Sequence, residues 1–448
     1  MTAAQNFDQA LPAALAVLKQ RFPAVSPLTT IVRDAFGLLT VVLPDSALAE
    51  ASDWDELADR LDAELGRYSP GVRRVLLRTS DLIDEDAICA SSDRIRLPDQ
   101  TNTWLLDRLQ TNQDWLRRPL SASPPLPTAI AFSIKGGVGR TTALALWAWH
   151  LARQGKKVVV VDLDLEAPGL AGVLLDEDRM PDFGVVDWLI ETLSGDADSF
   201  PLSECLGECA LAESTPGRIR VLPAFGKRTR NYINKLGRVF MPVFSNDDEA
   251  RLLGFAERLQ RLLVQIKRLD DTPDAVLLDS RAGLHDISSA AITRLAAEVF
   301  MFARDDYQGW QAYVLLFDHL RHAPSIEWGM PDDDLRWRLK MVAAQVEPAA
   351  AARQRFVDRS YETWLALYDA EGDDAGVLGS ATARLFEQGE DGPHQPLLVD
   401  FDPRVRSFDL SQKDKLPEWE LVKHTFGDFF TGATRRLFPA DADGEDSP

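Results

Sequence analysis

The segment Phe132–Thr142 (FSIKGGVGRTT) constrains the fold of this chain more than any other part of the sequence. The apolar run Ile130–Ile134 predicts a strand, and Thr141–Gln154 has the apolar spacing of a helix. Between them, glycines allow backbone N–H groups to turn toward an anion, and the helix N-terminus directs its dipole at the same point. We therefore predict a strand–loop–helix unit that binds phosphate, with its glycines at positions 136, 137 and 139.

The loop departs twice from the general phosphate-loop pattern G-x-x-x-x-G-K-[ST]. Ile134 stands in place of the first glycine, and Arg140 stands in place of the lysine. Arginine keeps the positive charge but is longer, planar and forked, so it does not simply replace an ammonium group. Two interpretations stay open: a loop that still neutralises phosphate charge, with slow or partner-dependent hydrolysis, and a loop that binds nucleotide without turnover.

Two further blocks place carboxylates where apolar strands end. Asp162 and Asp164 follow the run Val158–Val161, and Asp279 ends the run Ala275–Leu278. Ligands of open α/β sheets bind at the carboxyl ends of the strands. Carboxylate and hydroxyl oxygens are ligands that Mg²⁺ prefers, so Thr141 and Asp279 are the expected metal-binding residues.

Short apolar runs that alternate with helical segments predict an α/β fold with a doubly wound, mostly parallel sheet. We expect this domain at 128–438, after a small α/β domain at 1–120 and a Pro/Ser-rich linker at 121–127. In the N-terminal domain, Trp104–Leu116 is expected to form a helix and Val72–Leu77 a strand. The acidic tail 439–448 lacks large apolar residues and is expected to be disordered.

Together these blocks resemble the deviant Walker A family of ParA, MinD and their relatives, whose loop reads K-G-G-x-G-K-[ST]-T. Lys135 falls on the family's signature lysine, which reaches the partner's nucleotide across a dimer, and Arg140 falls on the phosphate-loop lysine. Asp164 falls on the carboxylate that helps to position the attacking water. The resemblance implies a P-loop NTPase fold, ATP and Mg²⁺ as ligands, and an ATP-dependent homodimer.

The resemblance also implies the nucleotide contacts. Gly283 lies in a run, DSRAG, that resembles the family's switch II near the γ-phosphate, while Gln345 and Pro403 lie where base-contacting residues are expected. The family's usual asparagine is absent at the base, so the base stays unassigned. The full implied set of nucleotide contacts is Gly136, Gly137, Val138, Gly139, Arg140, Thr141, Thr142, Asp162, Gly283, Gln345 and Pro403.

Three functions are compatible with these residues. The first is a slowly hydrolysing ATPase that acts as a dimerisation switch and controls a partner protein, with Lys135, Arg140 and Asp164 as its catalytic residues. The second is a catalytically silent nucleotide-binding scaffold or sensor in a bacterial signalling or defence system. The third, an ATP-dependent amide-forming enzyme, ranks last because no glutaminase-like Cys/His block is present.

Charge and cysteine content limit the expected partners and compartment. The net charge of −21 opposes binding to phosphate backbones and anionic lipids, so nucleic acid is not a default partner. The basic stretch 227–238 is the one place where contact with DNA phosphates is considered, although a solvated face packed against acidic residues is favoured. Three cysteines are too few for a disulfide framework and fit a reducing cytoplasm, and neither a secretory signal nor a transmembrane segment is expected.

Two smaller features have structural interpretations. The C-terminal segment Trp419–Leu437 has apolar residues at helical spacing, which resembles a membrane-binding terminal helix. Its polar face mixes both signs of charge, so we expect it to pack onto the nucleotide-binding domain and not on a membrane. Cys205 and Cys209 form a C-x3-C pair without further soft ligands nearby, so we expect no metal there.

Overall fold

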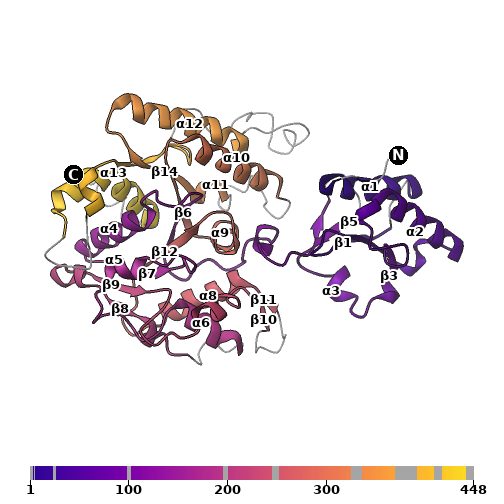
Figure 1. The fold of residues 1–448 in the computed structure, drawn as a ribbon, viewed down its shortest axis with the longest axis horizontal. Coiled ribbons are helices and arrows are strands. Elements are labelled where there is room, and N and C mark those ends of the chain that lie inside the picture. The colour runs from indigo at the N-terminus through magenta and orange to yellow at the C-terminus, as the bar shows by residue number, and fades with distance from the viewer. Residues whose placement is uncertain are drawn as a thin grey trace. The chain divides into compact units, whose positions relative to one another are not determined.

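The computed structural model of the chain divides into two compact units, Met1–Arg118 and Pro119–Pro448 (Figure 1). Each unit is described by itself. The structure describes residue 4 and residues 6–23, 27–97, 102–194, 200–244, 252–323, 335–368, 391–407 and 416–439. The expected acidic tail lies outside these residues apart from Pro439.

The first unit is a five-stranded sheet in the order β3-β2-β1-β5-β4 with two long helices. Residues of both helices share one apolar core with Ile31, Val41 and Leu105 of the sheet. This core accounts for the independent compactness of the unit. The elements are α1 (Phe7–Arg21), β1 (Thr29–Arg33), β2 (Leu39–Leu43), α2 (Ala51–Leu65), β3 (Leu76–Arg78), α3 (Asp86–Cys89), β4 (Ile95–Arg96) and β5 (Thr103–Asp107).

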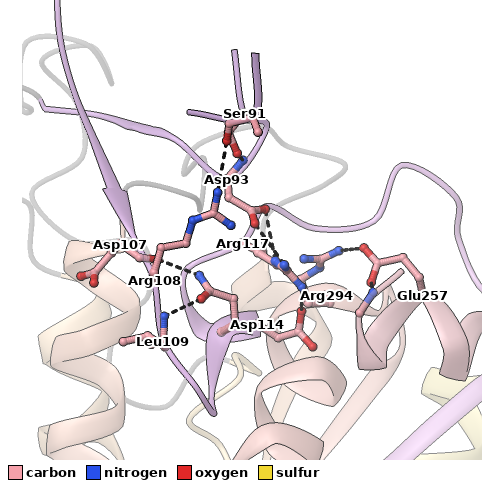
Figure 2. A network of polar contacts seen from close by, with 12 residues as sticks. Ser91, Asp93, Asp107, Arg108, Leu109, Asp114, Arg117, Glu257 and Arg294 are labelled. Atoms are coloured by element: carbon pink, nitrogen blue, oxygen red, sulfur yellow. Dashed lines mark hydrogen bonds and ion pairs between the residues drawn. The ribbon is translucent and has the colours of Figure 1, made fainter. Parts of the chain in front are cut away.

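The predicted helix at Trp104–Leu116 is wrong. Its first residues form β5, which pairs in parallel with β1 in the middle of the sheet, so tertiary pairing overrides the helical spacing. The chain then bends, because the Gln113 side chain accepts a hydrogen bond from Leu109 N (2.8 Å) and donates one to Asp107 O (3.0 Å). Figure 2 shows this bend, and beyond it the ion pair of Arg117 with Asp93 (3.0 Å) that secures the end of the unit.

The second unit confirms the predicted α/β class and the doubly wound sheet. Its eight strands lie in the order β15-β14-β13-β6-β12-β7-β9-β8, and every pairing is parallel except that of β8 with β9. The strands are β6 (Thr128–Ser133), β7 (Lys157–Asp162), β8 (Gly207–Glu208), β9 (Arg218–Leu222), β12 (Ala275–Ala282), β13 (Glu298–Ala303), β14 (Leu339–Val346) and β15 (Leu397–Asp400). A separate hairpin pairs β10 (Val243–Phe244) with β11 (Leu252–Leu253).

Helices cover both faces of this sheet (Figure 1). They are α4 (Arg140–Arg153), α5 (Leu170–Leu174), α6 (Val185–Glu191), α7 (Tyr232–Leu236), α8 (Phe255–Lys267), α9 (Asp286–Ser289), α10 (Tyr307–His322), α11 (Leu335–Arg338), α12 (Ala350–Tyr368) and α13 (Trp419–Leu437). After α9 the chain continues as a π-helical turn, Ala290–Arg294. Alternate residues of the buried strands face opposite layers: Phe300 contacts Trp147 of α4, whereas Phe132 contacts Tyr313 of α10.

The expected packing of the C-terminal segment on this unit is confirmed. The ring of Phe429 in α13 lies 5.7 Å from Trp147 and 5.8 Å from Phe300, between centroids, and the Trp147 indole donates to Thr434 Oγ1 at 3.0 Å. The apolar face of α13 is therefore part of the main core. Across the described part of the chain, no helix combines the length and apolarity that crossing a membrane requires.

Residues 119–127, which include the linker expected at 121–127, run along the second unit. Leu120 N donates to Arg294 O (2.9 Å), Gln260 donates to Ser123 O (2.9 Å), and Val276 N donates to Pro127 O (2.9 Å). The proline-rich stretch thus leads directly into β6 along the surface of this unit.

A close crossing of two loops beside β9 yields a prediction about stability. Arg228 N donates to Asp182 O (2.8 Å), and a Cβ atom on Gly226 would lie only 2.4 Å from Asp182 C and Phe183 N. Because backbone cannot move aside as a flexible side chain does, Gly226→Ala is expected to lower the free energy of unfolding by about 1–3 kcal/mol. Denaturant titration followed by circular dichroism measures this change.

Gly427→Ala is the matched control, since Gly427 lies inside α13 and its Cβ would meet only Lys423 Cγ at 3.9 Å. Alanine is favoured over glycine by about 1 kcal/mol inside a helix, so this variant is expected to be neutral or more stable. Equal effects of the two substitutions would contradict the proposed crowding at Gly226.

Candidate functional site

The glycine-rich loop lies between β6 and α4, as the sequence predicts. Gly137 and Gly139 have φ angles of +73° and +88°, a backbone conformation that side chains with a Cβ rarely adopt. At Gly139 space is also short, because a Cβ there would lie 3.1 Å from Gln345 Nε2. The loop can therefore wrap its backbone around an anion at the N-terminus of α4, a helix of 14 residues.

Arg140 directs its guanidinium toward carboxylates. Its Nε donates to Asp279 Oδ1 at 2.7 Å, one Nη donates to Ser133 Oγ at 3.1 Å, and the other donates to Asp164 Oδ2 at 3.3 Å. The residue is only 7% exposed. Sequence reasoning places Arg140 beside phosphate, and the structure adds that its cation already has protein partners.

Asp279 and Thr141 form a pair of oxygen donors beside the loop. Thr141 Oγ1 donates to Asp279 Oδ2 at 2.6 Å, and Asp279 is 1% exposed at the carboxyl end of its buried strand run. Burial raises the pKa of Asp279, and the charge of Arg140 opposes that rise. One carboxylate and one hydroxyl fit Mg²⁺, which takes few protein ligands and completes its shell with phosphate and water oxygens.

The side chain of Asp162 is enclosed by the protein and hydrogen-bonded to its backbone. It is fully buried and accepts hydrogen bonds from the backbone N–H groups of Asp164 (3.0 Å) and Leu170 (3.1 Å). Burial, followed by the neighbouring charge of Asp279, raises its pKa to about 7. Asp162 therefore shapes the loop after β7, which carries Asp164.

Lys135 lies on the opposite side of the loop and has two partners at the start of α10. Its Nζ donates to Asp306 Oδ1 and to Gln308 Oε1, both at 2.8 Å. Burial alone raises the pKa of Asp306, but hydrogen bonds from Lys135 and from Gly309 N hold it below its ordinary value. Sequence reasoning missed Asp306. It is the residue just before α10, where Asp is a typical N-cap, and its side chain accepts a hydrogen bond from Gly309 N.

A backbone hydrogen bond joins the DSRAG run to the end of β6, which leads into the phosphate loop. Gly283 has a φ angle of +104°, and its N–H donates to Ser133 O at 3.0 Å. Arg281 forms an ion pair with Glu166, which joins this run to the loop after β7. Burial, reinforced by the charge of Arg281, lowers the pKa of the adjacent His285 to about 4, so that its imidazole is neutral at physiological pH.

A pocket adjoins the loop on the side of β14 and β15. Gln345, expected at the base, lines it and has an unusual φ of +56° at an irregularity near the end of β14. Pro403 is exposed and does not line the pocket, although its neighbours Asp402 and Val405 do. Val138, Gly139 and Thr142, which the sequence places at the nucleotide, also line the pocket. The sequence did not indicate the rest of the wall, because it comes from β13, β14, α13 and the segment around the end of β15: Phe302, Ala344, Val399, Asp400, Phe401 and Phe426.

The basic stretch 227–238 is largely paired within the unit, which supports the favoured interpretation of a face packed against acidic residues. Lys235 Nζ lies 2.5 Å from the buried Asp187, and Arg228 pairs with Asp182 at 3.3 Å. Tyr232 donates its hydroxyl proton to Leu165 O (2.6 Å), so this stretch also contacts the loop that carries Asp164.

Metal-binding side chains are otherwise dispersed. Among the described residues, no three His, Cys, Asp or Glu side chains gather in a group that could hold a metal ion. Cys205 and Cys209 are buried free thiols, and burial raises the pKa of both.

Comparison with known proteins agrees with this geometry. Residues 129–324 match the family model described as the CobQ/CobB/MinD/ParA nucleotide binding domain. The septum site-determining protein MinD of Buchnera aphidicola subsp. Baizongia pistaciae is 33% identical over 113 residues, which are 25% of this chain and 37% of that protein. MinD of Escherichia coli K12 is 31% identical over 108 residues, 24% of this chain and 36% of MinD. The chain thus matches little more than a third of the length of these relatives.

Solved structures of ParA proteins match the chain at low identity and low TM-score. The ParA family ATPase from Chlorobium tepidum TLS is 15% identical and covers 68% of this chain and 98% of its own, with a TM-score of 0.40. The structure of pNOB8 ParA bound to nonspecific DNA is 16% identical and covers 70% and 98%, with a TM-score of 0.41.

Proposed function

The chain carries a nucleotide-binding domain of the CobQ/CobB/MinD/ParA family, and from this premise we propose that it is an Mg-ATP-dependent dimerisation switch with slow ATP hydrolysis. The observation that carries the proposal is the convergence of Lys135, Arg140, Thr141, Asp164 and Asp279 around one phosphate loop. This set contains the cations, the Mg²⁺ ligands and the carboxylate that phosphoryl transfer to water requires.

Each residue has a proposed role. The loop backbone and α4 bind the phosphates, Thr141 and Asp279 hold Mg²⁺, and Asp164 orients the attacking water. When bound, Mg²⁺ supplies charge neutralisation at the phosphates. Lys135 and Arg140 add positive charge, and we place the base in the pocket lined by Gln345.

Exposed apolar side chains support a nucleotide-dependent contact between two copies. Phe225, Leu284 and Tyr307 follow β9, β12 and β13, so they lie at the carboxyl edge of the sheet, where the phosphate loop also lies. Tyr307 is 72% exposed, and it is the residue directly after Asp306, the partner of Lys135. We propose that these three side chains contribute to the contact between the two copies.

The switch is proposed to control a partner protein. The three cysteines are free thiols, which supports a reducing compartment such as the cytoplasm.

Lys135→Ala provides the test of the dimer. In the wild type, Mg-ATP is expected to double the mass measured by light scattering, whereas ADP is not. Lys135→Ala is expected to stay monomeric with ATP, because we propose that this lysine binds the partner's nucleotide. Lys227→Ala, which removes an exposed lysine that contacts Asp178 O, is the matched control and is expected to dimerise like the wild type.

Phosphate release separates the switch from the second function, a silent scaffold or sensor. A wild type that dimerises with ATP and releases phosphate above the uncatalysed rate supports the switch. ATP binding without either event would favour the scaffold, and a requirement for a small-molecule acceptor would favour an amide-forming enzyme.

A further inference from the structure

We propose that Arg140 is a positioning residue that holds Asp164 and Asp279 in place, beyond any charge it contributes at the phosphates. The inference rests on the proposed function in one respect, the role of Asp164 toward water. In this chain Arg140 stands where the family's loop has a lysine.

The contacts of Arg140 connect three adjacent strands. Ser133 ends β6, Asp279 lies in β12, and Asp164 follows β7 by two residues, and the sheet order places β6, β12 and β7 side by side. Arg140 itself begins α4. One side chain therefore fixes the carboxyl ends of three strands and the start of a helix relative to one another.

The shape of the guanidinium suits this task. Its N–H groups point in different directions within one plane, so Nε and both Nη atoms can each serve a different acceptor. A lysine has a single ammonium nitrogen at the end of its stem. From position 140 that nitrogen cannot reproduce three donor positions that are spread over a guanidinium plane.

Several negative charges lie at this edge of the sheet, and a cation is needed among them. Asp162, Asp164 and Asp279 lie within a few residues of the ends of β7 and β12, and Asp279 pairs with Asp162 in the strand register. Arg140 forms ion pairs with two of the three, Asp164 and Asp279. Removing one partner of a buried pair leaves an uncompensated charge, so the geometry of the carboxylates depends on Arg140.

Asp164 in particular is held from two sides. One carboxylate oxygen accepts from Arg140 Nη, and the other accepts from Ala167 N at 3.3 Å. In addition, Leu163 N donates to Asp279 O at 2.9 Å, which ties the backbone before Asp164 to β12. Loss of the guanidinium would remove the side-chain contact that connects Asp164 to the phosphate loop.

Arg140→Lys is the decisive variant, because lysine is the family's usual residue and keeps the charge. If Arg140 acts only as a phosphate cation, the variant will hydrolyse ATP as fast as the wild type or faster. If Arg140 is a positioning residue, Arg140→Lys is expected to lower kcat for phosphate release by about 10- to 100-fold, the cost of misplacing a reacting group. The KM for ATP is expected to stay within about threefold, because lysine still neutralises phosphate charge.

A double-mutant cycle with Asp164→Asn shows whether the loss of kcat in Arg140→Lys passes through Asp164. Once Asp164 is replaced, Arg140→Lys is expected to lower kcat by a smaller factor than in the wild type, because only the contacts with Asp279 and Ser133 are then left to lose. Additive losses in kcat would overturn the proposal, and so would an unchanged kcat in the single variant. Arg153→Lys, near the other end of α4, is the matched control for the substitution itself.

The same cycle in nucleotide-free protein separates this inference from the proposed function. If the wild type releases no phosphate, the switch fails, but the contact between Arg140 and Asp164 remains measurable in unfolding. Arg140→Lys and Asp164→Asn are then expected to lower the free energy of unfolding non-additively. Strictly additive changes would overturn the positioning role regardless of activity.

Discussion

Asp164→Asn is expected to lower the rate of phosphate release by about 100- to 1000-fold, within the range contributed by a positioned acid or base group. Asparagine keeps the size of the side chain but removes the negative charge that orients water. The carboxylate is 15% exposed beside the phosphate loop, so it can reach a bound water. Single-turnover phosphate release measures the rate, and a fluorescent ATP analogue measures binding, which is expected to change little.

Asp178→Asn is the control for this prediction, because Asp178 is exposed in the loop after α5 and makes its contact with Lys227 through its backbone oxygen. It is expected to release phosphate like the wild type. If Asp164→Asn does the same, the assignment of the water-orienting residue is wrong. With binding intact and hydrolysis lost, Asp164→Asn is also expected to accumulate the ATP-bound dimer.

Arg258→Met is expected to lower the free energy of unfolding by about 2–4 kcal/mol, because several buried carbonyl groups lose their donor at once. Arg258 lies in α8, is 2% exposed, and donates to Val239 O (2.6 Å), Met241 O (3.0 Å) and Leu189 O. Burial lowers its pKa to about 10, so the side chain still carries its proton at neutral pH. Methionine fills much of the same volume but donates no hydrogen bond.

Lys267→Met provides the comparison on the same helix, since Lys267 is exposed in the last turn of α8. Removing it costs only a favourable interaction with the helix dipole, about 0.3–1 kcal/mol. Thermal and denaturant unfolding of both variants tests the prediction. A loss for Arg258→Met no larger than that for Lys267→Met would show that these carbonyl contacts contribute little.

The sequence predicts most of the second unit because its signals are local. β-branched runs such as Val158–Val161 suit strands buried on both faces, and the glycines at 137 and 139 occupy positions where positive φ angles are required. The carboxylates at 164 and 279 were found for the same reason, since each follows or ends such a run. Their convergence follows from strand order, which alternating α/β patterns restrict strongly.

The sequence does not predict features that depend on contacts between distant segments of the chain. Trp104–Asp107 reads as part of a helix until β1 supplies its strand partner. Nothing in the phosphate loop reveals that Lys135 contacts Asp306, 171 residues away, or that Arg140 faces carboxylates from two other strands. The pocket beside Gln345 is formed by side chains from β13, β15 and α13 as well as the loop, and no single motif encodes it.

We propose that ATP binding brings two copies of the chain together and that hydrolysis separates them. The most direct test of this proposal is the mass of the wild-type protein, 49.8 kDa as a monomer, measured by light scattering over time after Mg-ATP is added. We expect a rise to twice the monomer mass, followed by a return to the monomer mass as phosphate is released. A mass that stays at the monomer value with saturating Mg-ATP would contradict the switch.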